Sequence, residues 1–214
     1  MEKGKILKFA LCNLQFALLL SGCVSFQVAG DIQKGRGELL YGDPKVALAY
    51  FQRAAELDPN YRLQTSIFPE GIWTYVGKAN YATGRMPEAR KALERARTRE
   101  EDNLAKLYLG LVLAQDGDRE RGLREIEAGL KGVSGWYDYV ESYHTDGPYW
   151  DTGRPLRRAI EKQLAAMGGR EANQKELIQN AAFLGRQIEI EIDRAQEHKL
   201  RDLQRKFHGD ERRN

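Results

Sequence analysis

Cysteine is almost absent from this 214-residue chain, and both examples, Cys12 and Cys23, lie near its start. Nothing after Cys23 can therefore form a disulfide framework or a zinc site built on cysteine. Histidine is nearly as scarce, with three residues in all. The formal net charge is only +3, which is too small to indicate a nucleic-acid partner.

Recognised catalytic motifs are lacking as well. The sequence contains no glycine-rich phosphate loop, no HExxH and no GxSxG. We therefore predict that the protein is not an enzyme and needs neither a cofactor nor a metal. A less favoured hypothesis is a metal or catalytic site made from scattered residues, namely Glu141, His144, Asp146 and Asp151.

The chain also lacks a hydrophobic run long enough to span a bilayer. Its apolar stretch Phe9–Leu20 is interrupted by Asn13 and Gln15. A membrane-spanning helix needs about 20 apolar residues, more than this stretch supplies. Lysines precede the stretch and small residues follow it, which is the pattern of a secretory signal.

The signal ends in Leu20-Ser21-Gly22-Cys23, which resembles the lipobox of bacterial lipoproteins. The resemblance implies that residues 1–22 are removed and that Cys23 carries acyl chains such as palmitate, followed by a tether over residues 23–27. Several acyl chains anchor a protein stably where one would be marginal. Val24 replaces the aspartate that retains such proteins in the inner membrane, which implies the periplasmic face of the outer membrane. The alternative is an ordinary signal peptide with an accidental cysteine.

The central stretch Trp73–Ala96 has the pattern of two helices folded back on each other. Its first helix has inward positions at i, i+3 and i+4, which are Trp73, Val76 and Gly77. Gly84 suits the left-handed end of that helix, and Pro87 suits the first turn of the next. Similar spacings precede this stretch, and a further copy follows 33 residues later, with Gly110, Gly117 and Gly122 in frame with Gly77, Gly84 and Ala89.

These copies resemble the tetratricopeptide (TPR) repeat, a helical hairpin of about 34 residues. The resemblance implies an all-α solenoid of about three repeats over residues 28–136. Its units are Val28–Tyr61, Glu70–Asn103 and Asn103–Trp136, with an insertion near residues 62–69.

The first helices of TPR pairs line a concave groove, and the resemblance transfers that role to matching positions here. The partner-binding residues that it implies are Arg36, Leu40, Thr74, Lys78, Tyr81 and Gln115, with Ile32, Ala82, Leu107 and Leu111 at further groove positions. Arg36, Lys78 and Tyr81 would suit an acidic or carboxylate-ended peptide. The alternative is that Arg36 and Lys78 are merely solvated.

An aromatic segment, Trp136–Trp150, interrupts the repeat pattern. We expect a short helix over Trp136–Tyr143 and then an ordered loop, so that residues 137–154 form one unit. The favoured interpretation is a cap over the third repeat, because terminal repeats need one. The alternative is a binding patch for protein or sugar, made of Tyr137, Tyr143, Tyr149 and Trp150.

C-terminal helices are predicted over residues 155–207. The first is PLRRAIEKQLAAM, and the second is long and amphipathic, with its apolar stripe packed along the repeats as a cap. Residues 208–214 are expected to form a disordered tail.

The TPR and lipoprotein resemblances together imply a membrane-anchored periplasmic adaptor. Lipidated TPR proteins of this shape serve as assembly factors for outer-membrane proteins, pili, secretion channels or polysaccharide export. We therefore expect a protein partner in the cell envelope and a membrane contact through the lipid. The alternative is a module that binds peptidoglycan or another polysaccharide through the aromatic segment, residues 136–150.

Overall fold

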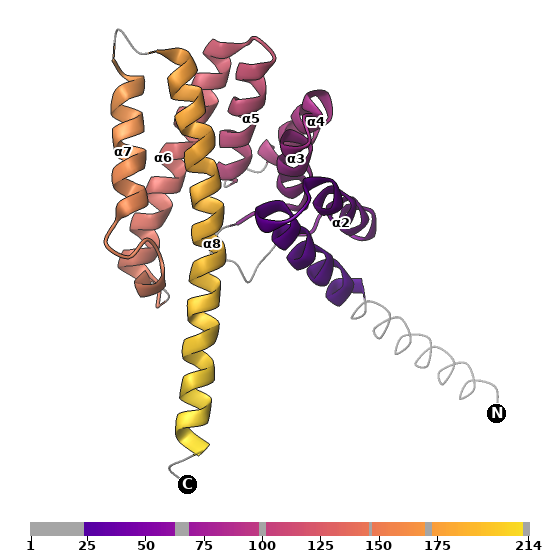
Figure 1. Cartoon of the computed structure of the whole chain (residues 1–214), viewed down its shortest axis with the longest axis vertical. Helices are drawn as coiled ribbons and strands as arrows, with labels where there is room; N and C mark the ends of the chain where they lie inside the picture. The colour runs from indigo at the N-terminus through magenta and orange to yellow at the C-terminus, as the bar shows by residue number, and fades with distance from the viewer. Residues whose placement is uncertain (1–23, 63–68, 99–101, 146, 170–172, 212–214) are drawn as a thin grey trace, which may run out of the picture.

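The computed structural model confirms that the protein is all-α (Figure 1). It describes residues 24–62, 69–98, 102–145, 147–169 and 173–211, with the side chains of 206–211 left out. Within these ranges the only β-type pairing is an isolated bridge between Arg62 and Gly71. Cys23, the signal segment and most of the predicted insertion lie outside the described residues.

The first hairpin pairs the helix of residues 24–41 with α2 (Pro44–Leu57). Residues 24–27 belong to the first of these helices, so no separate tether is seen there. The side chain of Asp43 caps α2 by accepting a hydrogen bond from Lys45 N at 2.8 Å, and Pro44 follows it in the first turn.

Two more hairpins follow, α3 (Ile72–Ala82) with α4 (Met86–Arg97) and α5 (Asn103–Gln115) with α6 (Arg119–Tyr143). Gly84 and Gly117 adopt the left-handed conformation in their turns, as the sequence predicted for Gly84. Gly77 is closely covered by Leu93, and a side chain at Gly110 would collide with the backbone of α6. Small residues therefore allow close packing within both hairpins.

The predicted break before Trp136 is wrong, because α6 continues without interruption to Tyr143. The buried positions Leu130, Val133, Tyr137 and Val140 recur every three or four residues, so one helix can pack along its whole length. The short 3₁₀ helix η1 (Gly147–Tyr149) follows. Then come α7 (Pro155–Met167), which matches the predicted helix, and α8 (Gln174–Glu211).

The buried apolar residues form two clusters. The N-terminal core lies between helix 24–41, α2 and α3, and includes Phe51 stacked on Tyr75 at 5.2 Å. The C-terminal core lies between α4, α5, α6, α7 and α8. The apolar stripe of α8 lies in the C-terminal core, through Ala181, Leu184, Ile188, Ile192 and Ala195.

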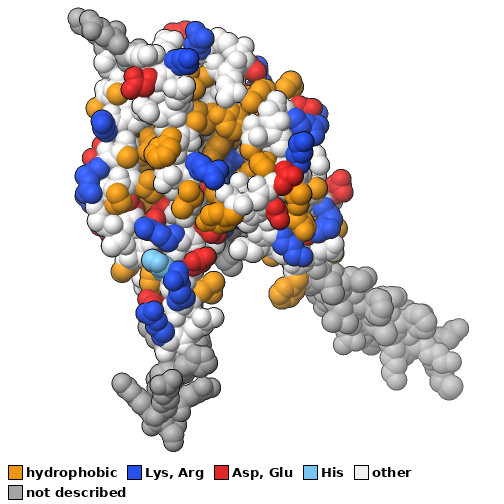
Figure 2. All heavy atoms as spheres, viewed as in Figure 1, with side chains coloured by type: hydrophobic (Ala, Val, Ile, Leu, Met, Phe, Trp, Pro, Cys, Tyr) orange, Lys and Arg blue, Asp and Glu red, His pale blue; other side chains and the backbone are white. Residues whose placement is uncertain are grey.

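The helix α8 packs on α5, α6 and α7, and its later turns extend beyond the rest of the bundle (Figure 1). Basic side chains gather over these later turns (Figure 2). None of the described helices combines the length and apolar composition needed to cross a membrane.

Candidate functional site: a groove occupied by α8

The predicted groove faces α8, and α8 lies against it. Arg36 and Lys78 have exposed fractions of only 2% and 1%, and Thr74 and Leu40 are buried as well. The prediction of an accessible groove at these positions is therefore corrected, because the chain's own C-terminal helix covers them. Tyr81 remains half-buried at the groove's end and receives a hydrogen bond from Gln115, which is exposed.

Lys78 is the centre of the contact between α3 and α8. Its Nζ donates to Glu70 Oε1 at 2.5 Å and to Glu189 Oε1, on α8, at 2.6 Å. The ammonium also lies 4.4 Å from the centre of the Tyr75 ring, a cation–π contact. Lys78 is therefore buried and paired within the chain, and it is not a solvated side chain.

Charge and burial act against each other at this cluster. Burial alone would lower the pKa of Lys78, but the nearby carboxylates of Glu189 and Glu70 outweigh it and raise that pKa. Burial raises the pKa of Glu189, and the Lys78 charge opposes that rise. The ion pair thus compensates a desolvation cost that both groups incur when α8 docks.

Helix 24–41 meets α8 through a second polar contact. Arg36 Nη1 donates to Gln196 Oε1 at 3.0 Å, and Arg36 Nη2 lies 4.0 Å from Asp193 Oδ1. Tyr41 donates its hydroxyl proton to the same Asp193 at 3.1 Å. In the opposite direction, Arg186 of α8 donates to the backbone oxygen of Leu40 at 3.0 Å.

Hydrogen bonding in this interface is incomplete. Arg36 Nε and Nη2, Glu70 Oε2 and Tyr75 Oη are buried and have no hydrogen-bond partner among the described residues. A cavity of about 180 Å³ lies in the same interface, lined by residues that include Leu40, Lys78, Tyr81, Arg186 and Glu189. The contact between the first two hairpins and α8 is therefore polar and loosely filled.

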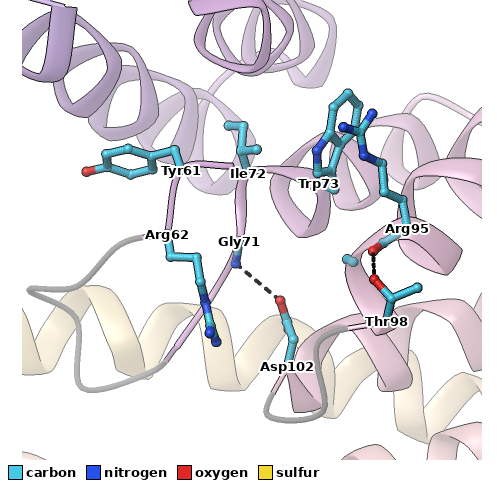
Figure 3. A pocket seen from close by; sticks show the side chains of 9 residues that line it. Tyr61, Arg62, Gly71, Ile72, Trp73, Arg95, Thr98 and Asp102 are labelled. Carbon is cyan, nitrogen blue, oxygen red and sulfur yellow. Dashed lines mark hydrogen bonds between the residues drawn. The ribbon is translucent and has the colours of Figure 1, made fainter. Parts of the chain in front are cut away.

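Thr74 has a structural partner instead of an external one. Its hydroxyl donates to Asp102 Oδ2, which also accepts from Gly71 N at 3.2 Å, while Asp102 Oδ1 caps α5 by accepting from Ala105 N at 2.9 Å. Burial, reinforced by the Glu70 charge, raises the Asp102 pKa to about 6. Asp102 lies beside a cavity of about 90 Å³ and joins the second hairpin to the third (Figure 3).

The predicted aromatic patch does not form a single surface. Tyr137 and Trp150 are buried in the C-terminal core, where Trp136 meets Trp150 edge to face at 5.6 Å. Tyr149 is half-buried, and Tyr143 is 80% exposed. The two most buried rings thus belong to the core, and the outward pair is Tyr143 with Tyr139, whose rings are 5.6 Å apart.

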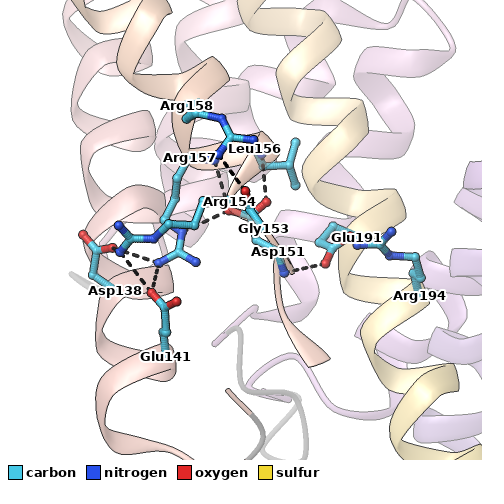
Figure 4. A network of polar contacts seen from close by, with 10 residues as sticks. All are labelled: Asp138, Glu141, Asp151, Gly153, Arg154, Leu156, Arg157, Arg158, Glu191 and Arg194. Atoms are coloured by element: carbon cyan, nitrogen blue, oxygen red, sulfur yellow. Dashed lines mark hydrogen bonds and ion pairs between the residues drawn. The ribbon is translucent and has the colours of Figure 1, made fainter. Parts of the chain in front are cut away.

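Carboxylates near the aromatic segment are paired with arginine (Figure 4). Arg157 Nε donates to the fully buried Asp151 at 3.0 Å, and its Nη1 reaches Asp138 at 3.1 Å and Glu141. Asp151 also caps α7 through Leu156 N at 2.8 Å, and its own N–H donates to Glu191 of α8 at 2.7 Å.

Glu141 and Asp151, two members of the hypothetical metal site, form ion pairs with arginine in this network. His144 is exposed, and Asp146 lies outside the described residues. Among the residues that the structure describes, no group of histidine, cysteine or carboxylate side chains could hold a metal ion.

Sequence reasoning identified the cations of the groove but missed their partners. Glu189, Asp193 and Gln196 follow an i, i+4, i+7 spacing and share one face of α8. The signal that could have found them is this polar row beside the apolar stripe.

Known proteins give no further guide to the groove. No family model matches the chain, and neither a curated protein nor a solved structure matches it. A function must therefore be inferred from the residues themselves.

Proposed function

We propose that the protein is a lipid-anchored adaptor of the bacterial cell envelope, built on TPR-like hairpins, which binds a protein partner through the groove that α8 occupies. The observation that carries the proposal is the charge match in this groove. Arg36 and Lys78 hold the row Glu189, Asp193 and Gln196 on one face of α8.

The partner that fits this groove is an acidic helix. Within the chain, the carboxylates of Glu189 and Asp193, one helical turn apart, and the amide of Gln196 contact the two buried cations. A partner helix with the same spacing would offer the same charges to Arg36 and Lys78. In this mechanism α8 is a ligand within the chain, and the partner competes with its polar face.

The polar contact between α8 and the hairpins is weak, which favours its replacement by a partner. A buried ion pair often contributes little net stability, because desolvation offsets the Coulomb attraction. The unpaired atoms of Arg36, Glu70 and Tyr75 weaken the contact further. The polar face of α8 can therefore be exchanged for a partner at lower cost than its apolar face.

The lipid places this adaptor at a membrane. Cys23 directly precedes helix 24–41, so acyl chains on that cysteine would keep the groove near the periplasmic face of the outer membrane. An adaptor held there could serve the assembly of an outer-membrane protein, a pilus, a secretion channel or a polysaccharide exporter.

In-cell photo-crosslinking tests the groove. A photoreactive amino acid replaces Tyr81 or Gln115, which are the accessible groove positions, and Lys162 on α7 is the control. We expect one envelope protein to be attached from both groove positions and not from Lys162. Attachment to α8 alone, from either position, would contradict the adaptor.

The anchor has its own test. Cys23→Ser should move the protein from the membrane fraction to the soluble periplasmic fraction, because the acyl chains have no other attachment point. Cys12→Ser, in the segment predicted to be removed, is the matched control and should leave the distribution unchanged. Membrane retention of the Cys23 variant would show that the lipid is not the anchor.

The alternative function, binding of peptidoglycan or another polysaccharide, is supported by a single observation. Tyr139 and Tyr143 are 56% and 80% exposed and lie side by side on α6, as rings that stack on sugars would. If this function holds, replacing both by serine should abolish co-sedimentation with purified cell wall without lowering the melting temperature.

A further inference from the structure

A second concave surface lies on the opposite face of α3 from Lys78. It is a pocket of about 280 Å³ between α2, α3 and α4, lined by Gln52, Trp73, Val76, Asn80, Arg85, Glu88, Lys91, Ala92 and Arg95. Positions 76 and 80 each lie two residues from position 78, and two residues on a helix are about 200° apart. The pocket is therefore separate from the groove, and α8 does not line it.

The rim of this pocket is basic. Arg85, Lys91 and Arg95 surround it, and its only carboxylate is Glu88, which pairs with Arg85 at 3.2 Å. Lys91 and Arg95 form no ion pair with any of the described residues. Two cations on one rim are thus available to an anionic ligand.

An apolar wall and an unpaired acceptor complete the pocket. Trp73 presents its ring to the guanidinium of Arg95 at 3.8 Å, and its indole N–H already donates to Pro59 O. Asn80 is only 3% exposed. Its Nδ2 donates to Val76 O, but its Oδ1 has no hydrogen-bond partner in the part of the chain that the structure describes. A ligand for this pocket should therefore combine a negative charge, an apolar group and an N–H donor.

We propose that this pocket binds an acidic peptide segment of a partner protein. Lys91 and Arg95 would pair with a carboxylate, the Trp73 ring with Val76 and Ala92 would contact an apolar side chain, and Asn80 Oδ1 would accept a peptide N–H. The headgroup surface of an anionic membrane supplies the charge but keeps its apolar acyl chains below the headgroups. The proposal rests on the adaptor function, and it adds a site that a partner can reach while α8 remains in the groove.

Peptide binding to the full chain, purified from membranes in detergent, tests the site. The probe is a fluorescein-labelled peptide, Leu-Asp-Ala-Glu-Leu-Asp, and the control probe carries Asn and Gln in place of Asp and Glu. The acidic peptide should bind at least tenfold more tightly than the control, as measured by fluorescence polarisation. Equal binding of the two peptides would overturn the proposal.

Matched variants locate the binding. The double variant Lys91→Glu/Arg95→Glu should weaken binding at least tenfold, whereas Lys162→Glu/Lys175→Glu makes the same charge change at exposed positions of α7 and α8 and should shift it less than twofold. Lys91→Gln with Arg95→Gln is a milder second pair for the case that the first fails to fold. Wild-type binding by a folded pocket variant would overturn the proposal.

Three further outcomes distinguish peptide binding at this pocket from simple anion binding and from binding in the groove. Anionic vesicles or inorganic phosphate that displace the peptide as well as unlabelled peptide does would overturn the peptide assignment. In a second outcome, the pocket variants bind the peptide normally while the partner is still crosslinked from Tyr81 and Gln115. That result would support the adaptor function and contradict binding at this pocket. If no partner is crosslinked from Tyr81 or Gln115 but the peptide still binds at the pocket, the result would contradict binding in the groove and support the pocket.

Discussion

The two sides of α8 are held by different forces. One side places Leu184, Ile188 and Ile192 in the C-terminal core against the third hairpin and α7. The other side offers Glu189 and Asp193 to Lys78 and Arg36 of the first two hairpins. Apolar packing is short-ranged and insensitive to salt and pH, whereas ion pairs respond to both. The comparison indicates that the first hairpin is the part that can move relative to α8, because the second hairpin is fixed to the C-terminal core through Ala89, Leu93 and Ala96 of α4.

Removal of the central cation should have the largest effect on the polar side. Lys78→Met leaves the Glu70 and Glu189 carboxylates buried and unpaired, which should cost about 3–5 kcal/mol of the free energy of unfolding. Adding Glu70→Leu and Glu189→Leu should recover most of that loss, because no charge then remains unpaired. Urea denaturation of the single and triple variants measures both changes, and a triple variant as unstable as Lys78→Met would contradict the electrostatic account.

A truncation on the apolar side gives the reference for this comparison. Ile188→Ala removes a fully buried side chain from the C-terminal core and should cost about 2–5 kcal/mol. This cost should be the same at low and high salt, whereas the cost of removing a charge from the polar side should depend on salt. Denaturation at two salt concentrations measures it, and a marked salt dependence would show that the two sides are not distinct.

Asp102 predicts how the joint between the second and third hairpins depends on pH. Its pKa is raised from 3.8 to about 6, so the folded protein holds this proton more tightly than the unfolded chain does. The resulting stability is fully present below pH 3.8 and is lost as the pH rises through about 6, a change of roughly 3 kcal/mol. Carboxyl NMR titration should locate this pKa, and Asp102→Asn should remove that part of the stability–pH slope.

The smallest effect is expected at the edge of the polar side. Asp193→Asn weakens a 4.0 Å contact with the buried Arg36, which keeps its hydrogen bond to Gln196, and a hydrogen bond from the exposed Tyr41. It should cost less than about 1 kcal/mol overall. Hydrogen exchange is the sharper measurement. Residues 24–41 should lose protection in the variant while α5 and α7 keep theirs, and equal loss in both regions would contradict separate movement.

Local sequence pattern predicted the elements well and their long-range partners poorly. Proline followed by a regular apolar stripe was enough to predict α7, and Gly84 was enough to predict the turn of the second hairpin. Lys78 and Glu189 are 111 residues apart, so nothing in the spacing of either helix reveals that they meet. The groove was therefore predicted without its occupant.

The aromatic segment shows a related limit. Counting tyrosine and tryptophan identified the segment but not which rings are buried. Tyr137 continues the buried stripe of α6 at Val133 and Val140, whereas Tyr139 and Tyr143 fall off that stripe and stay exposed. Continuing the helical periodicity of α6 past Trp136 would have separated the buried rings from the exposed ones. The predicted break at Trp136 prevented this step.

The length of α8 has a mechanical consequence. Its 38 residues form a rod of about 57 Å, and helix 24–41 is attached to one side of that rod by ion pairs and hydrogen bonds. Tension applied at the start of helix 24–41 would load those contacts together with the N-terminal core, in which Val28 and Ile32 of the same helix are buried. Hydrogen bonds and ion pairs break over a short extension, so a pull on this helix would separate Arg36 and Tyr41 from α8 while the core of α5 to α8 stayed folded.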